Sequence, residues 1–335
     1  MTNAAMTPSD LKRRDILVRL AGACALGLGL SYAAHASKTG RVSGQRKSGK
    51  VLPRLAKEMS KVARISLLSH EAQFDLVKTK EGWVLPQSDF YPVADAPLRR
   101  LMQALTNLRY VRTLPQPTAL DGPASHIDPR TGGDGVSLTL ETEDKIQLAS
   151  LTLAHRGEMT LAQLFGDDVL YHVSGADWPP LKRAKAWLDL PTFDMAPERI
   201  ATVELIRPGQ AQLDLVRRPD GGFAPLGGKP SPMITDIALL LGRFEPQDAM
   251  AAEKLGSAPA FRHSTSLKSG LIIALDGYES ASRFWVKVGT DRGLAASPAE
   301  GERLAAQTNG WAYEISAKLW TLLLTPTALL LQASP

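Results

Sequence analysis

The chain has 335 residues, of which 44% are hydrophobic and 22% are charged, and its mean hydropathy is -0.10. This composition is typical of a soluble globular protein and excludes the collagen-like, disordered and multi-span membrane classes. At ~100 to 200 residues per domain, the length allows two or three compact units that each bury a core.

The formal net charge of +5 is concentrated near the N-terminus. Residues 1–36 carry a net charge of +2, residues 37–64 carry +8, and the remainder of the chain carries -5. A surface that binds a nucleic-acid duplex needs clustered cations on the folded domain itself. We therefore expect no nucleic-acid partner.

The first 36 residues have the three parts of an export signal. A basic segment with Arg13 and Arg14 precedes an apolar run, which ends in the small residues Ala34 and Ala36. The arginine pair resembles the twin-arginine export motif. We therefore predict that residues 1–36 are a twin-arginine-like signal peptide, with Arg13 and Arg14 as the export signal and cleavage at Ala34 to Ala36. The alternative is an uncleaved inner-membrane anchor, which also places the body outside the cytoplasm.

Residues 37–61 are basic and begin with a stretch rich in glycine and serine, so we interpret them as a solvated linker. The cations give this linker a second interpretation, peripheral contact with anionic lipid headgroups. The single cysteine of the sequence, Cys24, lies in the leader. A mature body without cysteine has no disulfide, no thiolate metal site and no thiol nucleophile.

The body contains an internal repeat. Residues 62–68 align with residues 200–206, and residues 74–78 align with residues 213–217. In both copies these stretches combine β-branched or aromatic residues with turn formers such as glycine and aspartate. The pattern predicts a three-stranded antiparallel meander in each copy.

An amphipathic helix is predicted after each meander. The first has apolar residues at the helical period, namely Leu98, Leu101, Met102, Leu105 and Leu108. The second repeats this stripe at a constant offset, with Ile234, Ile237, Leu241 and Phe244. Asp95 is placed to cap the first helix, and Ser231 occupies the same place before the second.

Further strands are predicted after each helix. The matched stretches are residues 135–140 with 270–275, 146–154 with 283–290, and 171–174 with 313–316. We therefore predict an α+β fold of two tandem similar units of about 135 residues, each with an antiparallel strand meander, an amphipathic helix, further strands and a closing helix. The first unit is expected over residues 62–190 and the second over residues 191–335.

Five short stretches mark the first half of the body: Leu52-Pro53-Arg54-Leu55, Val62-Ala63-Arg64-Ile65, Gly82-Trp83-Val84-Leu85, Tyr91-Pro92-Val93-Ala94-Asp95 and Trp187-Leu188-Asp189-Leu190. Their order resembles the bacterial domain of unknown function 4340 family. The resemblance implies an N-terminal membrane-entry segment and a repetitive extracytoplasmic body. Genes of that family often neighbour gliding-motility-type ABC-transporter components, so it also implies an accessory role at the envelope. It supplies no catalytic residue.

Histidines are the residues that a metal ion or a general base would use first. His126, His155 and His172 could converge in the first unit, but no pair has helical ligand spacing, and Glu314 takes the place of His172 in the second unit. The body has no nucleophile elbow, phosphate-binding loop or dinucleotide fingerprint. We therefore predict no metal ion, no cofactor and no catalytic residue.

Other residues whose side chains could act in catalysis or ligand binding have ordinary structural explanations. Acidic residues cluster in strand-connecting turns, where they are common, at Glu141, Glu143, Asp144, Asp167 and Asp168. A glycan could be cleaved by two of them facing each other across a cleft. The six tryptophans are expected to be packing anchors instead of a ligand platform. The apolar residues 319–331 are expected to form a buried helix-to-strand segment or a partner-docking tail.

The sequence therefore predicts an exported, periplasmic, non-catalytic binding or scaffold protein. Its expected partner is an envelope or inner-membrane protein, as in an ABC-transporter-associated assembly. The alternative is a periplasmic hydrolase that acts on glycan or peptide at a site between the two units. A third hypothesis, a solute-binding receptor, requires a deep hinged cleft. An enzyme should gather desolvated, pKa-shifted acids or histidines in one pocket, whereas a binding protein should expose an apolar or aromatic patch.

Overall fold

The structure is a computed structural model that describes residues 48–114, 127–167, 169–174, 177–193, 195–226, 229, 231–256, 258–292 and 298–332. The predicted signal peptide, with Arg13, Arg14, Ala34 and Ala36, lies outside the described residues, and so does His126. Among the described residues, no helix combines the length and the apolar character needed to cross a bilayer.

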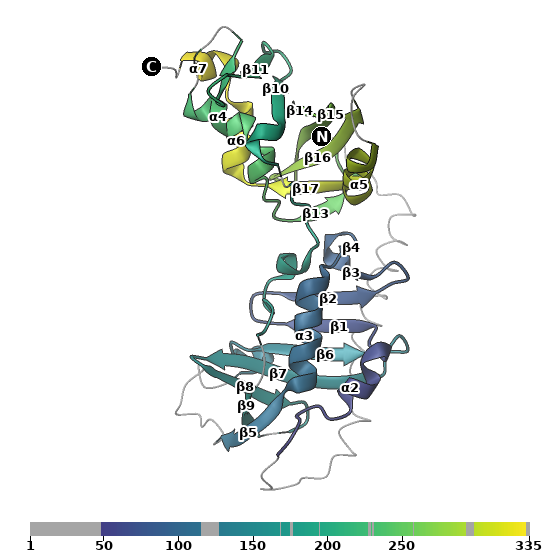
Figure 1. Cartoon of the computed structure of the whole chain (residues 1–335). Coiled ribbons are helices and arrows are strands. Elements are labelled where there is room, and N and C mark those ends of the chain that lie inside the picture. Colours follow the sequence, from purple (N-terminus) through teal and green to yellow (C-terminus); the bar gives the residue numbers. More distant parts are fainter. Residues whose placement is uncertain are drawn as a thin grey trace, which may run out of the picture.

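The first unit is built on a nine-stranded antiparallel sheet with the order β4-β3-β2-β1-β6-β7-β8-β9-β5. Its strands are β1 (Arg64–Leu68), β2 (Gln73–Lys78), β3 (Trp83–Leu85), β4 (Tyr91–Pro92), β5 (Arg109–Leu114), β6 (Val136–Glu141), β7 (Gln147–Arg156), β8 (Met159–Leu164) and β9 (Leu170–Ser174). Helix α3 (Asp95–Asn107) lies across this sheet (Figure 1). Its apolar stripe is buried because Leu98, Leu101 and Leu105 belong to the core that the sheet forms.

The second unit is built on an eight-stranded antiparallel sheet with the order β12-β11-β10-β14-β15-β16-β17-β13. Its strands are β10 (Ile200–Ile206), β11 (Leu213–Arg217), β12 (Phe223–Pro225), β13 (Ala249–Ala251), β14 (Phe261–Leu267), β15 (Leu271–Ser280), β16 (Arg283–Arg292) and β17 (Trp311–Ile315). Its helices are α4 (Pro232–Ala238), α5 (Pro298–Thr308), α6 (Ala317–Leu324) and α7 (Thr327–Gln332). The predicted α+β class, with antiparallel meanders and helices, is confirmed.

Apart from β4, the two sheets have the same strand order, as a duplicated unit would. This order corrects two sequence matches. Strand β6 corresponds to β14 and β7 to β15, whereas the sequence comparison matched residues 135–140 with 270–275, in β15, and residues 146–154 with 283–290, in β16. The prediction overlooked β4, β5 and β8 in the first unit and β13 and β14 in the second. More residues separate β5 from β6 than β13 from β14, and α5 separates β16 from β17. The extra residues between β5 and β6 in the first unit are balanced by the α5 segment in the second. The sequence offset is therefore similar at both ends of the unit, although the strands in its middle are shifted by one.

The predicted helix caps have different outcomes. The Ser231 hydroxyl accepts a hydrogen bond from the Ile234 N–H at 3.3 Å, which confirms that cap. The cap predicted at Asp95 is wrong, because α3 begins at this residue and its carboxylate pairs with Arg99 one turn later, at 3.2 Å.

Helix α4 is shorter than predicted, because a separate 3-10 helix, Leu241–Arg243, follows it. The closing helix of the first unit is likewise a short 3-10 helix.

The second part of the predicted linker is folded onto the first unit. Val51 and Leu55 are buried, and the Val51 N–H donates a hydrogen bond to the Leu108 carbonyl at 2.8 Å. Helix α2 (Leu55–Glu58) and the 3-10 helix Met59–Lys61 follow. The first unit therefore starts earlier than the predicted boundary, because apolar side chains of this segment complete its core.

The C-terminal apolar segment forms helices α6 and α7 and no strand, so the predicted helix-to-strand transition is wrong. Arg207, only 2% exposed, holds the junction of the two helices. Its guanidinium donates hydrogen bonds to the carbonyls of Leu323 (3.3 Å) and Thr325 and to the Thr327 hydroxyl. A cation at the end of α6 also interacts favourably with the helix dipole.

Candidate functional site

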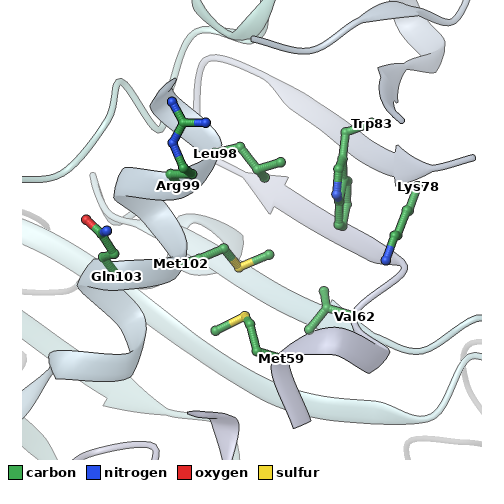
Figure 2. A pocket seen from close by; sticks show the side chains of 8 residues that line it. All are labelled: Met59, Val62, Lys78, Trp83, Leu98, Arg99, Met102 and Gln103. Carbon is green, nitrogen blue, oxygen red and sulfur yellow. The ribbon is translucent and has the colours of Figure 1, made fainter. Parts of the chain in front are cut away.

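A pocket of about 300 Å³ opens between helix α3 and the meander of the first unit (Figure 2). Four of its residues come from the chain that leads into and forms the meander, and four lie on α3. The lining residues are Met59, Val62, Lys78, Trp83, Leu98, Arg99, Met102 and Gln103. The pocket exists because α3 packs its leucine stripe on the sheet while the 3-10 helix before β1 stands beside it.

The floor of the pocket is apolar and partly accessible. Val62 and Leu98 are buried, whereas Met59, Trp83 and Met102 are half-buried. Figure 2 shows the two methionine side chains in the middle of the pocket, with Trp83 on the side opposite α3. Thioether side chains adapt their shape to a ligand, and an indole ring supplies a large rigid contact surface. The floor can therefore receive an apolar side chain.

The rim of the pocket is cationic. Lys78 is exposed at the end of β2 and has no ion-pair partner in the described part of the chain. Among the described residues Arg99 pairs only with Asp95, and both side chains are largely exposed, at 67% and 82%. Such a helical pair contributes only ~0.2 to 0.5 kcal/mol, so a ligand carboxylate can compete for the arginine. No carboxylate, histidine or hydroxyl group lines the pocket.

The junction between the two units, where the hydrolase hypothesis places a site, contains a network of opposite charges. Arg283 bonds Asp248 at 2.6 Å and Glu314 at 2.8 Å. Lys185, from the first unit, bonds Glu314 at 2.8 Å and lies 3.4 Å from Asp248. Ser88, also from the first unit, donates to Asp248 at 2.9 Å. These contacts join the 3-10 helices Pro86–Ser88 and Ala184–Trp187 of the first unit to β16, β17 and the residue before β13 in the second.

The Glu314 carboxyl of this network is not tuned to act as a general acid. The hydrogen bond from Arg283 holds the pKa of the Glu314 carboxyl below its usual range, against the effect of burial, and raises the pKa of Arg283 itself. A general acid at neutral pH needs a raised carboxyl pKa. The arrangement therefore serves to bind the two units together.

An aromatic cluster lies at the same junction. The Tyr91 ring is 4.7 Å from the Trp311 ring and 6.1 Å from the Tyr313 ring, with edge-to-face geometry in both pairs. The Tyr91 hydroxyl donates to the Asp189 carbonyl at 3.0 Å. Burial raises the pKa of Tyr91 to about 12 and also raises the pKa of Tyr313. The junction thus combines apolar packing with paired charges.

A strained turn completes the junction. Asp89 and Phe90 have φ values of 56° and 63°, in the left-handed region that bulky residues rarely adopt. The Asp89 carboxylate accepts a hydrogen bond from the Ala251 N–H at 3.0 Å and also pairs with Lys254. The turn places Phe90 in solvent, 60% exposed. Contacts with the second unit therefore hold this conformation of the first.

The structure does not bring the described candidate histidines together. His155 pairs with Thr160, whereas His172 pairs with the next residue of β8, Leu161. Because side chains alternate between the faces of a sheet, the two histidines point to opposite faces. Among the described residues, no three histidine, aspartate or glutamate side chains form a group that could hold a metal ion. Burial lowers the pKa of His155, whose Nδ1 lies 3.3 Å from the Thr160 hydroxyl.

The candidate acids lie at strand ends and in turns, where two of them make local contacts. Glu141 lies 4.0 Å from Arg64, and Asp167 accepts a hydrogen bond from the Tyr171 hydroxyl at 3.0 Å. Glu143 and Asp144 lie in the turn between β6 and β7, and Asp168 lies outside the described residues. No contact between these acids brings two of them together in the described structure.

The tryptophans divide into two groups. Trp187 is fully buried and donates its indole N–H to the Pro180 carbonyl at 3.0 Å, as expected for a packing anchor. Trp83 departs from that expectation, because it forms one wall of the pocket. The match of Trp83 with Phe223 in the repeat does not indicate that Trp83 lines a pocket. The residues of the pocket and of the unit junction were missed because they are dispersed along the sequence.

Comparisons with known proteins add no functional information. No protein-family model, curated protein or solved structure matches this chain.

Proposed function

We propose that the chain is an exported binding protein that docks a protein partner at the cell envelope. The observation that carries the proposal is the pocket beside α3, where a partly exposed apolar floor meets the unpaired cation Lys78. A protein ligand would insert an apolar side chain between the two methionines and Trp83. A carboxylate next to that side chain would bind Lys78 and displace Asp95 from Arg99.

The chemistry of the pocket favours a protein ligand. Tryptophan and arginine are enriched among the residues that dominate binding energy at protein interfaces. Methionine-rich surfaces accept partners of varied shape. A stable interface buries ~1,200 to 2,000 Å² in total, so a docked partner would also cover the exposed face of α3 around the pocket.

The place of action is the periplasm in this proposal. Support comes from the predicted signal in residues 1–36 and from the resemblance to a family whose genes neighbour ABC-transporter components. We therefore propose an inner-membrane protein of such an assembly as the partner. The basic segment before the folded body would strengthen the encounter with an anionic membrane surface.

The paired acids at the unit junction favour binding over the hydrolase alternative. Asp248 and Glu314 are engaged by Arg283 and Lys185, and the pKa of the Glu314 carboxyl is lowered. A hydrolase would need one of two facing acids to stay protonated near neutral pH. Turnover of a glycan or peptide by the purified protein would therefore contradict the proposal.

Site-specific photo-crosslinking in living cells tests the proposal. A photo-reactive amino acid at Gln103, on the rim of the pocket, should form one major adduct with an inner-membrane transporter subunit. The matched control is Gln147, an exposed glutamine on β7 of the same unit, which should form no such adduct. Adducts of equal yield from both positions would contradict the proposal.

Pocket variants make the test specific. Met102→Glu puts a carboxylate on the apolar floor and should reduce the Gln103 adduct at least tenfold, while the circular dichroism spectrum and melting temperature stay close to those of the unmodified chain. Lys78→Glu should reduce the adduct less, because it removes only the contact with the carboxylate. An adduct that persists in Met102→Glu would show that the partner binds elsewhere.

A further inference from the structure

Strand β5 forms an open edge of the first sheet (Figure 1). It pairs with β9 on one side. Residues 49–51 cover the start of its other side: the Tyr110 N–H donates to the Gly49 carbonyl at 3.0 Å, and Lys50 bridges Arg109. Beyond this point, residues 111–114 have no backbone partner on the outer side in the described part of the chain. Folded proteins usually protect such edges.

The equivalent edge of the second sheet is protected. Strand β13 has the same place in its sheet as β5, and its outer side meets the strained turn of the first unit. There the Asp89 carboxylate accepts a hydrogen bond from the Ala251 N–H at 3.0 Å and pairs with Lys254. The second sheet thus shows how an acidic group can cover such an edge. Its carboxylate accepts a hydrogen bond from an edge amide and pairs with a nearby cation.

The open edge is suited to an acidic ligand. Arg109 and Arg112 are exposed on β5, and neither has an ion-pair partner among the described residues. Val111 is 52% exposed at the β-bulge between Tyr110 and Arg112, where apolar surface lies between the two cations. Strand β13, whose ligand comes from the same chain, has Ala249, Met250 and Ala251 instead.

We infer that the outer edge of β5 binds an acidic, extended segment of a partner protein as an added strand. Backbone hydrogen bonds to residues 111–114 supply the affinity, and carboxylates that reach Arg109 and Arg112 select the sequence. The chain's own residues 37–47 are a poor occupant, because they are basic and contain no acid. This inference is independent of the pocket, since the two surfaces share no residue.

Peptide binding to the purified full chain tests the inference. The probe is a fluorescent nine-residue peptide of alternating threonine and glutamate, which favours an extended conformation; its control has lysine in place of glutamate. The acidic peptide should bind saturably, as measured by anisotropy, and more weakly at high salt. The basic control should not bind. Hydrogen–deuterium exchange should show slower exchange in residues 109–114 when the acidic peptide is bound.

Two variants locate the binding edge. Arg112→Glu should weaken binding about tenfold, and Val111→Pro should abolish it, because a proline ring at this exposed bulge blocks the approach of an added strand. Lys268→Glu, at an exposed cation in the turn between β14 and β15, is the matched charge control and should leave binding unchanged. Slow exchange, in the free chain, of those amides of residues 111–114 that face away from β9 would show that another segment of this chain already covers the edge, and would overturn the inference. Binding that survives Val111→Pro would also overturn it.

Discussion

The Ser88 hydroxyl donates a hydrogen bond of 2.9 Å to the Asp248 carboxylate across 160 residues of sequence. Both residues are buried, at 6% and 7% exposure. Ser88 belongs to the turn at the edge of the first sheet, and Asp248 immediately precedes the edge strand of the second. Because Asp248 also bonds Arg283 and faces Lys185, one carboxylate connects both units.

Replacement of Asp248 by alanine should therefore destabilise the protein as a whole. The change leaves Arg283 with one acid instead of two and leaves the Ser88 hydroxyl unpaired, so we expect a loss of ~2 to 4 kcal/mol in the free energy of unfolding. Ser88→Ala should cost about 1 kcal/mol, and much less in the Asp248→Ala background. Urea denaturation of the four proteins measures this coupling.

The control for this prediction is Asp236→Ala, which removes an exposed ion pair with Arg243. Exposed pairs contribute ~0 to 1 kcal/mol, so this variant should unfold almost like the parent chain. If Asp248→Ala and Asp236→Ala have equal effects, the junction network does not stabilise the contact between the units.

The sequence predicted the parts of the fold that depend on local pattern. The meander strands β1 and β2 and helix α3 follow from alternation and from the leucine stripe, because each buries one face against a single neighbouring layer. Strand β14 was overlooked because its sequence, with Arg262, His263 and Ser264, has polar residues at successive positions. His263 is nonetheless fully buried, which only the packing of α4 over the sheet explains.

The candidate sites depend on tertiary placement and could not be predicted in this way. The junction uses Ser88 and Asp89 from one turn and Tyr91 from β4, together with Asp248, which precedes β13, and Glu314 from β17, with no common spacing. In the repeat Glu314 is the counterpart of His172, and its sequence position does not indicate its ion pairs with Lys185 and Arg283. The pocket needs Met59, which precedes the first predicted strand, to lie against a helix about 40 residues later.

Replacement of Arg207 by methionine should release the C-terminal helices. The substitution leaves the buried carbonyls of Leu323 and Thr325 without their donor, so we expect a loss of ~2 to 4 kcal/mol. Arg207→Lys should not restore stability, because an ammonium group lacks the planar set of donors that reaches several acceptors at once. Limited proteolysis should cut the variant first within α6 and α7.

The control for this prediction is Arg218→Met, at an exposed arginine that pairs with Asp220 in a turn. It should change neither the stability nor the cleavage pattern. Cleavage of Arg207→Met at the same rate as the parent chain would contradict the role of Arg207 in holding the C-terminal helices.

His263 should make stability depend on acid pH. Burial lowers its pKa from 6.5 to about 4, while its Nε2 lies 2.9 Å from the Ile237 carbonyl. Between pH 6.5 and about 4 the His263 imidazole therefore binds a proton in the unfolded chain but not in the folded chain. The contribution of neutral His263 to the free energy of unfolding should be fully present above pH 6.5. The free energy of unfolding should then fall between pH 6.5 and about 4, by up to ~1.4 kcal/mol per pH unit.

The variant His263→Gln keeps an N–H donor for Ile237 and removes the titration. It should be less stable than the parent at pH 7 but lose less stability between pH 6.5 and 4, as measured by urea denaturation at several pH values. Parallel pH profiles for the two proteins would show that acid unfolding is due to other groups.

Two glycines in the second sheet should respond oppositely to alanine. A Cβ atom on Gly277 would lie 2.2 Å from the ring of Phe261, its cross-strand partner, which is 1% exposed. Gly277→Ala must displace this ring from the core and should cost at least ~1 to 3 kcal/mol. A Cβ atom on Gly289, in β16, meets nothing within 4 Å, so Gly289→Ala should be neutral or stabilise the strand by ~0.5 to 1 kcal/mol. Thermal unfolding of both variants tests this pair, and equal melting temperatures would mean that the Phe261 ring has room to move aside.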